Sequence, residues 1–116
     1  MFTMKLDEKY YNYILNGTKE YEIRLNDEKR KSLKKGDLIK FYNNSNEGDY
    51  FISQVEELIY FNNFKEVVDS INMKSLSDKN ESPSDFLNTL DHFYSKEEQE
   101  KYGVVAIKLN KNIYNI

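Results

Sequence analysis

The amino-acid sequence predicts an α+β fold, a small and mostly antiparallel β-barrel with helices packed at the barrel openings. Its 116 residues are enough for one domain, and residues 1–116 contain no internal repeat. About five short segments have the composition of β-strands, and they do not alternate strictly with helical segments. This order favours a small barrel or curved sheet over a parallel α/β sheet.

The first part of the chain predicts two strands separated by a helix. Residues 2–6 form a short strand, after which Asp7 is a good N-cap for a helix over residues 8–16. Gly17 supplies the left-handed residue that ends this helix. From residue 19 to 25 apolar and charged residues alternate, which predicts a half-buried strand with a charged face.

The middle of the chain predicts two further strands. Residues 26–35 are polar around the apolar anchor Leu33, and a Gly-Asp turn leads into a strand over residues 38–42. We expect residues 43–49 to form a hairpin loop. A long strand over residues 50–61 follows, and its acidic middle predicts a bend or a partly exposed far end.

The last part of the chain predicts three helices and a final strand. A short helix over residues 64–71 precedes a polar stretch, residues 72–82, whose lack of any period predicts a mobile loop. A Ser-Pro start and a Ser-Glu capping box begin two more helices, at residues 83 and 96. Residues 103–109 are almost continuously apolar, which predicts a strand buried on both faces. The helix from residue 83 has a buried stripe that consists of Phe86, Leu87, Leu90 and either Phe93 or Tyr94.

Composition excludes several classes of protein. The absence of cysteine excludes disulfides, thiolate zinc sites and a cysteine nucleophile. A single histidine, His92, excludes two-histidine metal sites, and we expect its side chain to be structural or exposed. No apolar run approaches the roughly 18 residues of a membrane span. We therefore expect a cytoplasmic protein with no membrane association, no metal and no cofactor.

Aromatic residues are abundant, with 10 tyrosines and 7 phenylalanines. Aromatic rings can stack on the bases of single-stranded RNA. A chain with a single alanine and little leucine or valine nevertheless needs most of these rings for its core. We therefore expect Tyr42, Tyr50 and Tyr60 to pack inside the protein.

Charge is segregated along the chain. Residues 19–40 carry eight basic and five acidic side chains, whereas residues 78–100 carry two basic and seven acidic ones. A phosphate backbone would be attracted to the first segment and repelled by the second. Lys29 and Arg30 belong to the densest cationic stretch, whose other lysines are equally well explained as a solvated surface.

The charged face of the strand over residues 19–25 carries the most informative polar side chains. Glu22 and Arg24 lie two positions apart on this face, Lys19 precedes them, and Gly17 allows a ligand to approach the backbone closely. Two interpretations remain open. Glu22 and Arg24 form a structural ion pair, worth about 0–1 kcal/mol if exposed. Alternatively, in a cleft, the arginine holds a phosphate or base edge while Glu22 accepts a hydrogen bond from an exocyclic amine.

Five segments, in this order, resemble those of one known family: residues 4–6 (MKL), 17–25 (GTKEYEIRL), 35–41 (KGDLIKF), a helix with Phe64, and 102–107 (YGVVAI). The family is that of ASCH domains (activating signal cointegrator homology), whose fold is similar to the PUA domains of RNA-modifying enzymes. The resemblance implies a PUA-like β-barrel with an RNA-binding cleft beside the first helix. Residue by residue, it implies a binding site made of Gly17, Lys19, Glu22 and Arg24.

The resemblance also extends to enzymes. One branch of the family hydrolyses the amide of N4-acetylcytidine with a threonine, a lysine and a glutamate, and another cleaves RNA. Lys19 matches the lysine of the first branch, but Glu22 stands where the threonine nucleophile is expected. The missing nucleophile argues against this activity, although Glu22 can still act as a general base with Lys19 as an electrostatic stabiliser.

Three functions follow from these observations. The first is an RNA-binding or nucleotide-binding domain, in which Lys19 and Arg24 contact phosphate or a base edge and Glu22 selects an amine-bearing base. Lys29 and Arg30 would add nonspecific attraction. The second is a hydrolase that acts on a modified nucleoside or on RNA through Lys19 and Glu22. The third is a protein-interaction module whose acidic stretch, residues 78–100, meets a basic partner.

Overall fold

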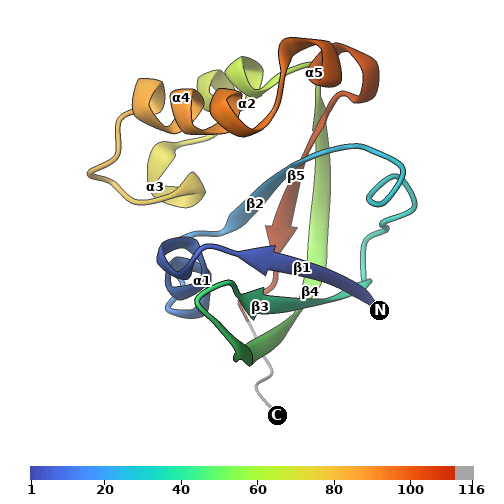
Figure 1. Cartoon of the computed structure of the whole chain (residues 1–116), viewed down its shortest axis with the longest axis vertical. Coiled ribbons are helices and arrows are strands. Elements are labelled where there is room, and N and C mark those ends of the chain that lie inside the picture. The colour runs from blue at the N-terminus through green and yellow to red at the C-terminus, as the bar shows by residue number, and fades with distance from the viewer. Residues whose placement is uncertain (112–116) are drawn as a thin grey trace.

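The computed structural model describes residues 1–111 and contains one five-stranded sheet and five helices (Figure 1). The elements in chain order are β1 (Phe2–Leu6), α1 (Glu8–Leu15), β2 (Tyr21–Leu25), β3 (Leu38–Asn43), β4 (Asn46–Phe61), α2 (Phe64–Ser70), α3 (Met73–Leu76), α4 (Pro83–Phe93), α5 (Lys96–Tyr102) and β5 (Val104–Leu109).

The sheet is a curled half-barrel with the strand order β1-β3-β4-β5-β2. The pair β1–β3 is parallel and the other three pairs are antiparallel. The two edges of the sheet are therefore β1 and β2, and α2 to α5 form a layer over one end (Figure 1). The predicted α+β, mostly antiparallel fold is confirmed.

The long strand β4 connects the two halves of the sheet. Its first half pairs with β3 and its second half pairs with β5, with a register shift between Val55 and Glu57. Residues 56–61 are exposed or half-buried, which confirms the prediction of a partly exposed far end. The hairpin loop predicted over residues 43–49 is wrong, because β4 already begins at Asn46 after a tight turn.

Two hydrophobic clusters lie on the two faces of the sheet. One fills the half-barrel and includes Phe41, Phe51 and Ile107, and the other lies under the helices and includes Phe64 and Ala106. Each fully buried phenylalanine contributes about 1.5–3 kcal/mol through burial alone. Successive residues of β5 belong to alternate clusters, which confirms the prediction of a strand buried on both faces.

Helix α1 covers one opening of the half-barrel. Its buried residues are Tyr11 and Ile14, and the Tyr11 ring lies 5.0 Å from that of Phe51. Asp7 holds the N-cap position as expected, but within residues 1–111 its carboxylate makes no hydrogen bond to the first turn. It accepts one from the Asn44 side chain at 3.4 Å instead.

The loop predicted over residues 72–82 is wrong in its first half, which forms helix α3 with Leu76 and Ser77 fully buried. The Ser75 hydroxyl donates to Glu20 at 2.7 Å, and the Tyr13 hydroxyl donates to Asp78 at 2.6 Å. These contacts fasten α3 and the following residues against α1 and the start of β2. Only two apolar residues, Met73 and Leu76, stand among polar ones here, which is too few to establish a period, so the sequence pattern did not indicate this helix.

The starts of α4 and α5 agree with the sequence, because Ser82 caps α4 before Pro83 and Ser95 forms a capping box with Glu98. The predicted stripe of α4 is confirmed with Tyr94 as its last member, since Phe86 is buried and Leu87, Leu90 and Tyr94 pack against the same cluster. Phe93 is 64% exposed because Tyr94 takes the inner position on the Phe64 ring.

Among the three tyrosines expected in the interior, Tyr42 and Tyr50 are half-buried, with ring centroids 6.1 Å apart. Tyr60 is 58% exposed, so the prediction of packing is wrong there. The reason is that this end of β4 extends beyond β3 and pairs with β5 along one edge. No helix in residues 1–111 has the length and apolar character to cross a membrane.

Candidate functional site

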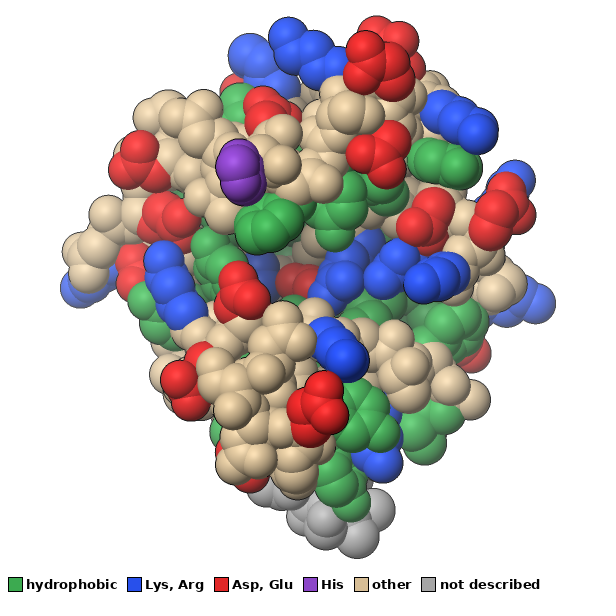
Figure 2. All heavy atoms as spheres, viewed as in Figure 1, with side chains coloured by type: hydrophobic (Ala, Val, Ile, Leu, Met, Phe, Trp, Pro, Cys, Tyr) green, Lys and Arg blue, Asp and Glu red, His purple; other side chains and the backbone are tan. Residues whose placement is uncertain are grey.

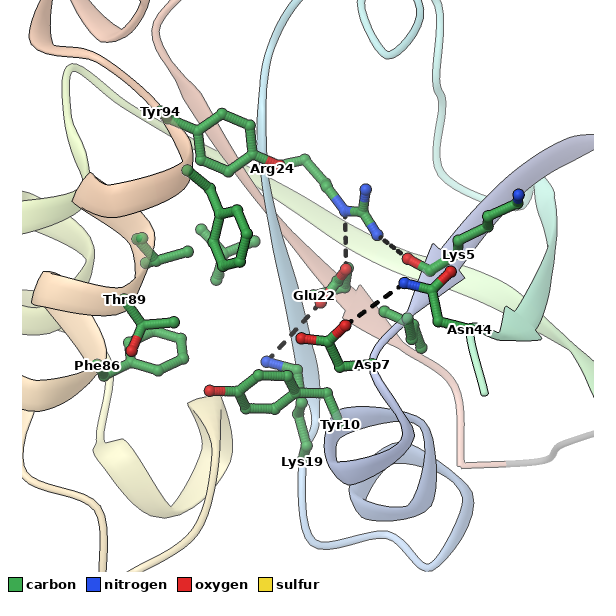
Figure 3. A pocket seen from close by; sticks show the side chains of 14 residues that line it. Lys5, Asp7, Tyr10, Lys19, Glu22, Arg24, Asn44, Phe86, Thr89 and Tyr94 are labelled. Atoms are coloured by element: carbon green, nitrogen blue, oxygen red, sulfur yellow. Dashed lines mark hydrogen bonds and ion pairs between the residues drawn. The ribbon is translucent and has the colours of Figure 1, made fainter. Parts of the chain in front are cut away.

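A cavity of about 250 Å³ lies where the two edges of the sheet face each other below α4 (Figures 2 and 3). Residues from β1, α1, β2 and α4 line it, together with the turn after β3. They are Lys5, Leu6, Asp7, Tyr10, Lys19, Glu22, Ile23, Arg24, Asn44, Phe86, Thr89, Leu90, Phe93 and Tyr94.

The alternating pattern of β2 explains the charges at the floor of the cavity. Glu22 and Arg24 are cross-strand partners of Ile107 and Val105, so they lie on the face of β2 that is turned toward the half-barrel. Since β2 is an edge strand, this face of β2 borders the gap between the two edges of the sheet, β1 and β2. Lys19 precedes the strand and enters the same space, where it is 4% exposed and Glu22 is 6% exposed.

These three side chains form a continuous chain of ionic contacts (Figure 3). Lys19 Nζ lies 3.8 Å from Glu22 Oε1, and Arg24 Nε donates to Glu22 Oε2 at 2.8 Å. Arg24 Nη2 also donates to the carbonyl oxygen of Lys5 at 2.7 Å. The Glu22–Arg24 pair is therefore a structural ion pair, and both of its side chains line the cavity.

Lys19 is enclosed by polar and aromatic groups. Its ammonium donates to the carbonyl oxygen of Leu76 and lies 5.3 Å from the ring centroid of Tyr10 and 5.5 Å from that of Phe86. Burial lowers the pKa of Lys19 from 10.5 to about 8, against the opposing attraction of Glu22. The side chain is therefore mostly protonated at neutral pH and loses its proton within the mildly alkaline range.

Arg24 stays charged at every physiological pH. Burial alone would lower its pKa, but the attraction of Glu22, Tyr94 and Asp27 and the hydrogen bond to Glu22 together outweigh burial, so the pKa is raised. The ionic side chains that line the cavity are Lys5, Lys19, Arg24, Asp7 and Glu22, so its lining has a net charge of +1 in a chain of net charge -3. The site therefore favours an anionic ligand.

Aromatic side chains form one wall of the cavity and polar side chains the other. Tyr10 comes from α1, Phe86 and Phe93 come from α4, and Tyr94 follows α4; Lys5 and Asn44 lie opposite (Figure 3). Burial, with Glu81 and other carboxylates nearby, raises the pKa of Tyr10 to about 12, so its hydroxyl remains a hydrogen-bond donor. This arrangement can stack a planar ring on one side and hydrogen-bond its edge on the other.

The other predicted site residues lie outside this cavity. Gly17, with a φ of 86°, ends α1 and lines a separate hollow together with Leu15 and Glu20. Lys29 is exposed, and Arg30 Nη1 donates to Asp27 Oδ2 at 3.0 Å. Both belong to the segment between β2 and β3, on the side where Figure 2 shows basic side chains that extend away from the hollow.

Sequence reasoning missed most of the residues that line the cavity, among them Lys5, Tyr10, Asn44 and Phe86. These four come from β1, α1, the turn after β3 and α4, so only the folded chain brings them together. The sequence pattern indicated Tyr10 and Phe86 only as members of apolar helix faces, and it gave no indication that they line a site. His92 is exposed, as one of the two alternatives for this residue predicted. In residues 1–111 the histidine, aspartate and glutamate side chains form no cluster suited to a metal ion.

Comparison with known proteins identifies the family. No curated protein matches the chain. The crystal structure of hypothetical protein PH0355 is 33% identical, with a TM-score of 0.82 over 99% of this chain and 98% of that chain. The solution NMR structure of protein PF0455 from Pyrococcus furiosus is 29% identical, with a TM-score of 0.74 over 94% of each chain. The sequence profile of the ASCH domain matches residues 4–113, and the chain therefore belongs to the ASCH domain family.

Proposed function

We propose that this ASCH domain binds RNA or a nucleotide in the cleft between β1, β2 and α4. The observation that carries the proposal is the convergence of Lys19, Glu22 and Arg24 at the floor of a cavity with an aromatic wall. A ligand that fits must combine a planar ring, hydrogen-bonding edges and negative charge. Nucleotides have all three properties.

The contacts assign different roles to the three ionic side chains. Lys19 is committed to Leu76 and Glu22, so its main effect is to hold the Glu22 carboxylate in place. Each oxygen of Glu22 keeps a lone pair for a further donor, such as the exocyclic amine of cytosine or adenine. Within residues 1–111, Arg24 Nη1 has no hydrogen-bond partner, so it is the donor available to a phosphate or a base carbonyl.

The size of the cavity limits the part of the ligand that enters it. Pockets for drug-sized ligands measure about 300–1,000 Å³, whereas this cavity measures about 250 Å³. It therefore suits one nucleobase with part of its sugar. The exposed Lys5 at the rim, together with Lys29 and Arg30 further away, would attract the phosphate backbone outside.

A second function is favoured by the titration of Lys19. A buried amine whose pKa is about 8 is suited to general acid-base catalysis near neutral pH. In a hydrolase acting on a modified nucleoside or on RNA, Lys19 and Glu22 would activate water. Such activity would vanish in Lys19→Ala and Glu22→Ala variants of unchanged fold, whereas a pure binding protein would show no turnover with any nucleoside.

An NMR titration tests the proposed function. At low salt, CMP and AMP should shift the amide signals of residues that line the cavity, and UMP should bind more weakly because it lacks the exocyclic amine. Lys5→Ala is a suitable variant because Lys5 is exposed, and it should weaken binding without loss of fold. Lys65→Ala, an exposed lysine on α2, is the matched control. The proposal fails if no nucleotide or RNA shifts these signals at low salt.

A further inference from the structure

We infer that the cleft takes a single strand of at least two consecutive nucleotides, with Phe93 stacking on the base next to the one in the cavity. The inference rests on the proposed function and specifies its ligand as an oligonucleotide. It starts from the exposed apolar side chain of Phe93, which lines the cavity.

Phe93 lies at the mouth of the cavity. Phe86 and Phe93 both line the cavity and are seven residues apart on α4, about two turns, so they lie on the same face of this helix. Phe86 is 3% exposed and forms the inner part of the aromatic wall, whereas Phe93 is 64% exposed and continues this wall to the surface. The wall is therefore longer than one base requires.

The Phe93 ring has little contact with the rest of the domain. Among residues 1–111 its one aromatic contact is His92, edge-on at 5.7 Å and 76°. An exposed phenylalanine keeps most of its apolar surface in water, so a ligand that covers the ring gains free energy by removing that surface from water. A nucleobase is a planar group that covers a ring face of this size.

Charge favours a nucleic acid over an apolar protein segment as the occupant. The same cavity contains Arg24 and Lys5, and Figure 2 shows basic side chains on one side of the hollow and hydrophobic ones on another. Aromatic faces beside cations match the alternating bases and phosphates of a single strand. A hydrophobic peptide would match Phe93 but would leave Arg24 without an anionic partner from the ligand. A duplex is disfavoured because its base edges are already paired.

A tryptophan reporter tests this inference directly. The chain has no tryptophan, so Phe93→Trp introduces a single indole at the mouth of the cleft. The tetranucleotides CpCpCpC and ApApApA should quench its fluorescence by stacking, whereas CMP and AMP should bind in the cavity without quenching it. Quenching that is equal for mononucleotides and tetranucleotides would overturn the inference.

Affinity measurements on Phe93→Ala provide the second test. Loss of one stacked base typically weakens binding about 5-fold to 100-fold. We expect this loss for the tetranucleotides and a clearly smaller loss for CMP and AMP, whose single base would lie deeper in the cavity against Phe86. Tyr60→Ala is the matched control, since Tyr60 is similarly exposed but lies outside the cavity lining. Phe93→Tyr should bind the tetranucleotides about as tightly as the wild type, because tyrosine keeps the aromatic face that alanine lacks.

The outcomes separate this inference from the proposed function. If mononucleotides bind but tetranucleotides bind no tighter, or if Phe93→Ala leaves tetranucleotide affinity unchanged, the inference fails and the proposed function stands. If neither class of ligand binds to the wild-type protein, both fail. If a basic or apolar peptide binds at Phe93 while nucleotides do not, the surface belongs to a protein partner and the inference is overturned.

Discussion

Arg24 joins the two edges of the sheet, because its Nη2 donates to the carbonyl oxygen of Lys5 at 2.7 Å. Lys5 belongs to β1 and Arg24 belongs to β2, which are the first and last strands of the sheet order. One side chain thus spans the gap where a closed barrel would have a strand pair. The same side chain holds Glu22, so the opening of the half-barrel and the candidate site are one feature of the fold.

The first prediction concerns this connection. Arg24→Lys keeps the positive charge but loses the planar fork that reaches Glu22 and Lys5 simultaneously. Hydrogen bonds to charged groups contribute about 1.5–3 kcal/mol, and we expect the free energy of unfolding to fall by about this amount in urea titrations. Lys65→Ala breaks only the exposed pair with Asp69 and should cost less than about 1 kcal/mol. An equally small loss in Arg24→Lys would show that the connection does not stabilise the fold.

The second prediction concerns the dependence of stability on pH. Burial lowers the pKa of Lys19 from 10.5 to about 8, so between these values the unfolded chain holds a proton that the folded chain has released. The contribution of Lys19 to stability is thus largest above pH 10.5 and is lost as the pH falls through 8. Between these values stability should rise by up to about 1.4 kcal/mol per pH unit.

Urea unfolding across the range from about pH 7 to about pH 9.5 measures this contribution as the difference between the wild type and Lys19→Met. The raised pKa of Tyr10 acts in the opposite direction at higher pH, and it cancels largely in this difference because both proteins contain Tyr10. Lys65→Met is the control and should follow the wild-type profile. Parallel profiles for the wild type and Lys19→Met would contradict the prediction.

The third prediction concerns the basic segment between β2 and β3. If Lys29 and Arg30 attract RNA nonspecifically, the double variant Lys29→Ala, Arg30→Ala should bind a tetranucleotide more weakly at low salt. Affinity falls as salt rises, and the magnitude of the slope of log affinity against log salt should become smaller by about one for each phosphate contact that is lost. Isothermal titration calorimetry at several salt concentrations measures both quantities. An unchanged slope would place these side chains outside the interface.

The fourth prediction concerns Gly103, which ends α5 immediately before β5. Its φ is 71°, and a Cβ there would lie 3.2 Å from the carbonyl oxygen of Phe61. Gly103→Ala should therefore cost about 1–3 kcal/mol for the positive-φ extended backbone alone, together with the displacement of β4 or β5. Gly48→Ala is the matched control, since its nearest contact would be a side-chain atom of Asn46 at 3.4 Å. Equal stabilities of the two variants, measured by thermal unfolding, would disprove the expected strain.

Much of the fold could be predicted from local sequence patterns. Alternation placed Glu22 and Arg24 on one face of β2, capping residues marked the starts of α4 and α5, and the apolar run 103–109 predicted a strand with two buried faces, which the structure forms as β5. Each of these features depends on interactions within a few residues or on a strict period. For this reason they can be read without knowledge of the rest of the chain.

The sequence by itself determined which side chains share a face, but only the tertiary structure decided what covers that face. Leu76 and Ser77 are buried because α3 docks beside Lys19, and Phe93 is exposed because Tyr94 packs on Phe64 in its place. The convergence of Lys5 with Arg24 depends on two strands that close a curved sheet from opposite edges. Contacts between residues so far apart in the chain depend on how the whole sheet curls, and no local period encodes that curvature.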